Sequence, residues 1–147
     1  MEYAIISGKD FNETRKKIRE NKGKEIVFTS DDDELNRKIL EKETISMLLI
    51  NQKGRKDRVK QRDSGFNQVL AKLAKKKNVI IGINLDEILG SVPEEKAEIL
   101  ARIRQNVKLC NKNKLKIRFI SKGARNQYDL KALGLVLGMP TWMTKTF

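Results

Sequence analysis

Short apolar runs alternate with segments of helical periodicity along the whole sequence. The most uniform runs, Met47–Ile50 and Val79–Ile83, consist of apolar residues and one glycine, which is typical of parallel strands buried on both faces. Three further strands are predicted at residues 3–6, 25–29 and 115–120. Strands that alternate with helices form βαβ units, so the sequence predicts one α/β domain, residues 1–147, with a right-handed parallel sheet. A closed eight-stranded barrel needs about 250 residues. The length of 147 residues therefore predicts an open or incomplete barrel.

The helices between these strands are marked by capping residues and apolar stripes. Helices are expected at residues 10–21 and from the acidic residues 31–34, which form the first turn of the second helix. Another is predicted over residues 63–77, with Asp63 or Ser64 as its N-cap and an apolar stripe of Phe66, Val69, Leu70, Leu73 and Ala74. The next opens at Ser91–Glu94, which has the sequence of a capping box. Its predicted buried arc contains Ile99, Leu100, Ile103, Val107 and Cys110, and its solvent-facing side contains Arg102, Gln105, Lys108 and Lys112.

The chain contains no histidine and one cysteine. The lack of an imidazole excludes Ser-His-Asp and Cys-His nucleophilic sites and all His-ligated metal centres. The one cysteine, Cys110, cannot form an internal disulfide, which suits a reducing compartment, and its place on an apolar arc predicts a core residue. The sequence has no secretory signal and no apolar run near the roughly 20 residues of a bilayer span, so we expect a cytoplasmic protein without a membrane partner.

The net charge of +13 is concentrated in two segments. Residues 53–77 contain ten basic and two acidic side chains, and residues 102–125 contain nine basic and no acidic ones. The stretches 53–62 and 121–125 each follow a predicted strand, so both basic loops are expected at the edge of the sheet where α/β folds bind ligands. Their candidate phosphate contacts are Lys53, Arg55, Lys56, Arg58, Lys60, Arg62, Lys122 and Arg125. Candidates for shaping the loops are Asp63, Ser64, Gly65 and Gly123, and pairing of Arg62 with Asp63 is an alternative role for that arginine.

A polyanion is the partner that this charge favours. Aromatic residues make up only 5% of the sequence, which leaves little surface for stacking of unpaired bases. No segment has the signature of an RNA-recognition motif, a helix-turn-helix or a zinc finger. Lysine and arginine without interleaved aromatics favour contacts to an RNA backbone, and they predict binding that weakens steeply with salt. A pair of solvated loops without a ligand is the alternative interpretation.

Several polar residues allow a second, chemical interpretation. Asp31, Asp32 and Asp33 lie where carboxylates cap a helix, and together with Asp86 they are the candidate ligands of a carboxylate-based, metal-dependent phosphodiesterase. The backbone N–H groups of residues 121–123 are candidates for binding a phosphate of RNA. A general RNA-binding or ribosome-associated module is a third function that the sequence allows.

Five segments carry a family resemblance: RDSGFNQVLAKLA (62–74), IGINL (81–85), RIRQNVKLC (102–110), SKGAR (121–125) and ALGLVLGM (132–139). In this order and spacing they resemble the archaeal ribonuclease P protein component 3 family, the counterpart of the thirty-kilodalton subunit of the eukaryotic enzyme. The resemblance implies a TIM-like α/β barrel related to the polymerase-and-histidinol-phosphatase (PHP) metallohydrolases. It also implies a protein subunit of the ribonucleoprotein that removes the 5′ leader from precursor tRNA.

The same resemblance implies how the chemistry is divided. The RNA of that particle is the catalyst, so no catalytic residue, metal ligand or cofactor is expected in this chain, and Mg²⁺ is expected for the RNA. The implied partners are the ribonuclease P RNA, a smaller protein subunit and other ribonuclease P proteins, with precursor tRNA bound indirectly. A chain without histidine is also unable to keep the metal site of its metallohydrolase ancestors.

Overall fold

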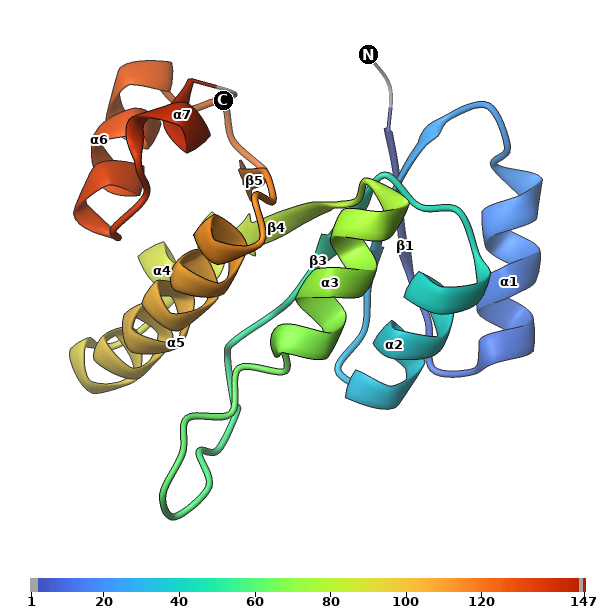
Figure 1. Cartoon of the computed structure of the whole chain (residues 1–147), viewed down its shortest axis with the longest axis horizontal. Coiled ribbons are helices and arrows are strands. Elements are labelled where there is room, and N and C mark those ends of the chain that lie inside the picture. Colours follow the sequence, from blue (N-terminus) through green and yellow to red (C-terminus); the bar gives the residue numbers. More distant parts are fainter. Residues whose placement is uncertain (1–2, 146) are drawn as a thin grey trace.

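The computed structural model describes residues 3–145 and 147, in which strands and helices alternate (Figure 1). The strands are β1 (Tyr3–Ser7), β2 (Glu25–Thr29), β3 (Met47–Leu49), β4 (Ile80–Asn84) and β5 (Ile117–Ile120). The helices are α1 (Phe11–Glu20), α2 (Asp33–Lys42), α3 (Gln68–Lys77), α4 (Leu85–Gly90), α5 (Pro93–Lys112), α6 (Gln127–Val136) and α7 (Thr141–Thr144). All five predicted strands and the helices expected around residues 10–21 and from 31–34 are confirmed, the second of them with Asp32 as its N-cap.

The strands form one parallel sheet in the order β1-β2-β3-β4-β5. Each connection is a crossover to the next strand, and right-handed crossovers in one direction place their helices on the same face of the sheet. Within the described residues β1 and β5 each pair with one neighbour, so the sheet does not close. The fold is therefore a short, incomplete TIM-like α/β barrel, as predicted.

The main core lies between the sheet and its helices. Phe28, Leu48 and Ile117 are fully buried on the helix-covered face of the sheet, against residues such as Ile39 of α2 and Ile99 of α5. The alternate residues of the strands form a smaller apolar cluster on the opposite face, made of Val27, Met47 and Leu49. Since β3 is buried on both faces, its sequence needs to be apolar throughout, which explains the uniform run that predicted it.

The helix predicted from residue 63 begins later than expected. Asn67 is the N-cap of α3, and its side chain accepts a hydrogen bond from the Leu70 N–H. Ser64 is buried in the preceding loop and Gly65 has a φ of +75°, a left-handed conformation that no helix continues through. The predicted core position Val69 is 57% exposed, so that part of the predicted apolar stripe was wrong.

The capping box predicted at Ser91–Glu94 does not form. Val92 occupies the N-cap position of α5 without a side-chain hydrogen bond, and Pro93 starts the helix. The Ser91 hydroxyl instead donates to the Ile88 carbonyl of α4, a short helix that the sequence analysis did not predict.

Two expectations about the chain as a whole can be compared with the structure. Cys110 is fully buried on α5, as predicted, and its burial raises the pKa of the thiol to about 12. Among the described residues, no helix is long and apolar enough to cross a lipid bilayer.

Candidate nucleic-acid interface

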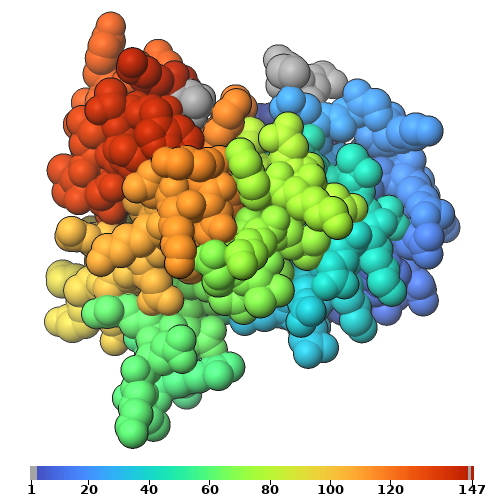
Figure 2. Space-filling model, viewed as in Figure 1, coloured from blue at the N-terminus to red at the C-terminus, as the bar shows by residue number. Residues whose placement is uncertain are grey.

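The basic loop that joins β3 to α3, residues 50–67, projects away from the sheet and its helices (Figure 1), and it forms a protrusion of the molecular surface (Figure 2). Five of its six predicted contact residues are exposed to solvent: Lys53, Lys56, Arg58, Lys60 and Arg62. The loop after β5 likewise exposes both of its cations, Lys122 and Arg125. Seven of the eight predicted cations are therefore accessible to a ligand.

The eighth cation, Arg55, is bound within the protein. Its guanidinium makes two hydrogen bonds to the Asp33 carboxylate, at 2.9 and 3.1 Å, and its Nε donates to the Asn51 carbonyl at 2.7 Å. The side chain is 14% exposed. Arg55 thus fastens the loop to the first turn of α2, and this geometry does not favour the direct phosphate contact predicted for it.

A buried arginine of α5, Arg102, fixes the base of the same loop. It is 2% exposed, and its guanidinium donates to the carbonyls of Gln52 and Arg55 at 3.3 and 2.8 Å and to the Asp57 carboxylate at 2.9 Å. Glu98, one turn earlier on α5, forms a longer ion pair with the same guanidinium at 3.9 Å. The prediction that Arg102 faces solvent was wrong, because the loop folds over α5 and uses all sides of this guanidinium.

Asp57 is held in its charged form by the loop and by α5 together. The backbone N–H of Asp63 donates to its carboxylate at 3.0 Å, and Arg102 donates to the same oxygen. These two bonds, in that order of importance, hold the pKa of Asp57 below its usual value.

The end of the loop is shaped by buried polar contacts around Ser64. The Gln52 side chain donates to the Ser64 carbonyl at 2.9 Å, and the Ser64 hydroxyl donates to the Asn106 side chain of α5 at 2.6 Å. A Cβ on Gly65 would lie 2.5 Å from the Arg55 guanidinium, which would then have to shift, and its positive φ also favours glycine. Three of the four predicted loop-shaping residues, Asp63, Ser64 and Gly65, lie in this segment, and Gly123 lies in the loop after β5.

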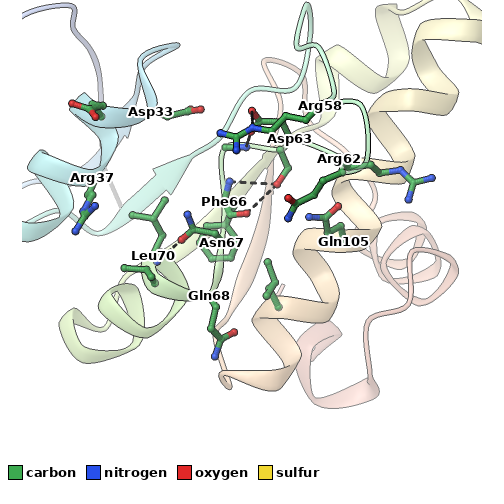
Figure 3. A pocket seen from close by; sticks show the side chains of 16 residues that line it. Asp33, Arg37, Arg58, Arg62, Asp63, Phe66, Asn67, Gln68, Leu70 and Gln105 are labelled. Atoms are coloured by element: carbon green, nitrogen blue, oxygen red, sulfur yellow. Dashed lines mark hydrogen bonds and ion pairs between the residues drawn. The ribbon is translucent and has the colours of Figure 1, made fainter.

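A hollow of about 470 Å³ lies between this loop, α2, α3 and α5 (Figure 3). Arg58 lies beside Asp63 there, with 3.6 Å between Nε and the carboxylate, and so makes the contact considered above for Arg62. Arg62 lies beside Gln105 of α5 instead. The hollow therefore has an arginine-rich rim toward α5.

Adjacent carboxylates of α4 tie both basic loops to one edge of the sheet. Glu87 accepts hydrogen bonds from the backbone N–H groups of Gln52 and Lys53, at 2.8 and 2.7 Å. Asp86 accepts from the Ser121 hydroxyl at 2.8 Å and from the Lys122 N–H at 3.0 Å. The two loops are thus neighbours, as the strand positions predicted, although α4 itself was not foreseen.

These two carboxylates have opposite pKa shifts. The hydrogen bonds from Lys122 and Ser121 lower the pKa of Asp86, since they stabilise its ionised form. Burial raises the pKa of Glu87, and this cost of desolvation outweighs the two backbone hydrogen bonds that favour its charged form. The Lys122 N–H, a candidate phosphate donor, is occupied by Asp86, while the Gly123 N–H donates to the Ser121 hydroxyl at 3.4 Å.

Three of the four acidic residues considered as metal ligands, Asp32, Asp33 and Asp86, have separate partners. Asp32 caps α2 by accepting from the N–H groups of Glu34 and Leu35, Asp33 binds Arg55, and Asp86 binds the β5 loop. Within residues 3–145 and 147, no three acidic or cysteine side chains converge as a metal ion would require. This arrangement does not favour the phosphodiesterase alternative.

Comparison with known proteins places these features in one family. Residues 26–144 match the sequence model described as RNase P subunit p30. Ribonuclease P protein component 3 of Methanococcus maripaludis strain C7 is 29% identical over 141 residues, which cover 95% of this chain and 58% of that protein. The protein of the same name from Methanocaldococcus jannaschii is 33% identical over 125 residues, 85% of this chain and 50% of the relative.

A solved structure supports the same grouping. A chain in the cryo-EM structure of archaeal ribonuclease P with mature tRNA superposes with a TM-score of 0.82 at 27% identity, covering 97% of this chain and 62% of that one. This chain thus spans less than two thirds of the length of each of these relatives.

Proposed function

This chain belongs to the RNase P subunit p30 family, and we propose that it is an RNA-binding protein subunit of ribonuclease P, the ribonucleoprotein that removes the 5′ leader from precursor tRNA. The observation that carries the proposal is the joint attachment of two exposed basic loops to Asp86 and Glu87. A polyanionic strand that lies across this edge meets cations from both loops, and no exposed aromatic ring lies in either loop to read unpaired bases.

In this proposal the seven exposed cations contact phosphates: Lys53, Lys56, Arg58, Lys60, Arg62, Lys122 and Arg125. Arg55 acts indirectly, since its bonds to Asp33 and Asn51 fix the loop that presents the others. Gly123, which has open space around its Cα, permits close approach of a phosphate to the second loop.

The chain by itself is non-catalytic, and the holoenzyme cleaves through its RNA. The lack of histidine and the separate partners of Asp32, Asp33 and Asp86 support this division of labour. Mg²⁺ is then bound by the RNA and not by this protein. The partners are the ribonuclease P RNA, a smaller protein subunit and other ribonuclease P proteins, with precursor tRNA bound indirectly, in the reducing environment of the cytoplasm.

Reconstitution with a loop variant tests the proposal. The triple substitution Lys56→Ala, Arg58→Ala, Lys60→Ala removes three exposed cations and leaves the Arg55–Asp33 contact in place. We expect weaker binding to the ribonuclease P RNA, slower cleavage of precursor tRNA and a salt slope reduced by about 1 for each lost phosphate contact.

A matched control removes the same charge elsewhere. Lys16→Ala, Lys22→Ala and Lys24→Ala alter exposed cations on and just after α1, a helix that packs on the opposite edge strand β1. The control should bind RNA as the parent protein does. If the loop variant and the control have equal affinity, cleavage rate and salt slope, the proposed function is wrong; cleavage by the purified protein without RNA would instead support the phosphodiesterase alternative.

A further inference from the structure

Three cations form a row on the exposed side of α5. Arg104, Lys108 and Lys112 are spaced by four residues and are all exposed, while Ile103 and Val107, which directly precede the first two, are buried. A four-residue step corresponds to a rise of about 6 Å along a helix, so the three charges are evenly spaced along one line.

Within residues 3–145 and 147, no acidic side chain forms an ion pair with this row. Residues 102–125 contain no aspartate or glutamate, and the acidic residues of α5 lie toward its other end, at Glu94, Glu95 and Glu98. The row therefore presents an uncompensated positive potential.

The row is continuous with the basic loop. Arg62 of the loop lines a hollow of about 390 Å³ together with Ala101, Arg104, Gln105 and Lys108 of α5. Figure 3 shows Arg62 beside Gln105 at this junction. At the far end Lys75 of α3 donates to the Lys114 carbonyl, which brings a further cation next to the end of α5. Figure 2 shows α3 and α5 side by side on one face of the molecule, with the basic loop extending below them.

We propose that Arg62, Arg104, Lys108 and Lys112 form a second RNA-binding surface, which follows a sugar–phosphate backbone along α5. The proposal rests on the proposed function and extends the contact beyond the two loops at the sheet edge. Protein interfaces are built around buried aromatic or aliphatic anchors. Among the described residues, no exposed large apolar side chain lies on α5, so this surface suits a nucleic-acid backbone better than a protein.

The test is a variant of α5 in which the row is uncharged and both loops are unchanged. The triple substitution Arg104→Gln, Lys108→Gln, Lys112→Gln retains residues of good helix propensity. Its binding is measured over a range of salt concentrations with two probes, transcribed ribonuclease P RNA and a generic RNA duplex. We expect the salt slope for both to fall by about 3 and the affinity to fall to a similar extent for both, because phosphate contacts are independent of sequence.

Three outcomes separate this inference from the proposed function. A reduced slope for the α5 variant and an unchanged slope for the Lys16, Lys22 and Lys24 control support the surface. An unchanged slope for the α5 variant, with a reduced slope for the loop variant, overturns the α5 surface and leaves the proposed function standing. If neither variant differs from the parent protein, both ideas are wrong.

A second measurement needs no substitution. Amine acetylation of the parent protein, followed by mass spectrometry, reports which lysines RNA covers. Lys108 and Lys112 should be protected by bound RNA, whereas Lys16 and Lys22 should react at the same rate with and without it. Equal reaction of Lys108 and Lys112 in both conditions overturns the proposal even if the triple variant fails to fold.

Discussion

Replacing Arg102 by methionine removes the guanidinium that fixes the basic loop while keeping much of the volume of its stem. The substitution leaves the carbonyls of Gln52 and Arg55 without their charged donor. A hydrogen bond to a charged group contributes about 1.5–3 kcal/mol. The Gln52 residue is buried, whereas the loop around Arg55 can open to water, so we take values near the lower end and expect a loss of about 3 kcal/mol. The Asp57 carboxylate is 34% exposed and can be rehydrated, so its ion pair adds nothing to this sum.

Urea and thermal unfolding of the full chain measure this loss. For a domain of this size about 3 kcal/mol corresponds to a decrease in Tm of roughly 6–12 °C. Arg104→Met on the exposed side of the same helix is the matched control and should change stability by less than about 0.5 kcal/mol. Limited trypsin digestion should cut Arg102→Met faster within residues 53–62. A loss below about 1 kcal/mol with unchanged digestion would refute the role assigned to Arg102.

Three further predictions concern two glycines of the loop, the two carboxylates of α4 and the buried Cys110. Gly54→Ala, at a φ of +77° in open space, should cost about 1–2 kcal/mol in urea unfolding, and Gly65→Ala should cost more because its Cβ also meets a guanidinium; equal costs would contradict that contact. Because the pKa of Asp86 is lowered, this carboxylate stabilises the fold above its ordinary value of 3.8, and that stabilisation is lost as the pH falls through the folded-state pKa. Because the pKa of Glu87 is raised, Glu87 stabilises the fold below its ordinary value of 4.5, and that stabilisation is lost as the pH rises through the folded-state pKa. As the pH is lowered, the free energy of unfolding of the parent protein should therefore lose its advantage over that of Asp86→Asn but gain relative to that of Glu87→Gln. The same pH trend for both variants would contradict these opposite shifts. Cys110, with a pKa of about 12, should not react with a thiol reagent at neutral pH until the protein unfolds.

The sheet and the position of its loops were predictable because their signals are local and repeated. Uniform apolar runs such as Met47–Ile50 are hard to place anywhere except in a parallel sheet with both faces covered. Once the strands are parallel, loops that follow β3 and β5 have to lie at the same edge. The placement of both basic loops followed from topology without any knowledge of side-chain contacts.

The attachments of the loops were not predictable from the same rules, because they depend on contacts between distant residues. Arg102 was assigned to the solvent side on account of its charge, although it follows Ile99 by three residues and precedes the buried Asn106 by four. That spacing was the one available signal that it faces the protein. Helix α3 begins at Gln68 and not near residue 63, because Ser64 is held in the loop by hydrogen bonds with residues 12 and 42 positions away. Propensity describes a residue's neighbours along the chain and contains no information about such partners.

The attachment of both loops to consecutive residues of α4 has a consequence for ligand binding. The Cα atoms of Asp86 and Glu87 are about 3.8 Å apart because one peptide unit joins them, so the anchored ends of the loops cannot move far apart independently. A partner that contacts both ends therefore binds two loops whose spacing is already set. The loops lose less conformational entropy on binding than they would if each were held only by its strand.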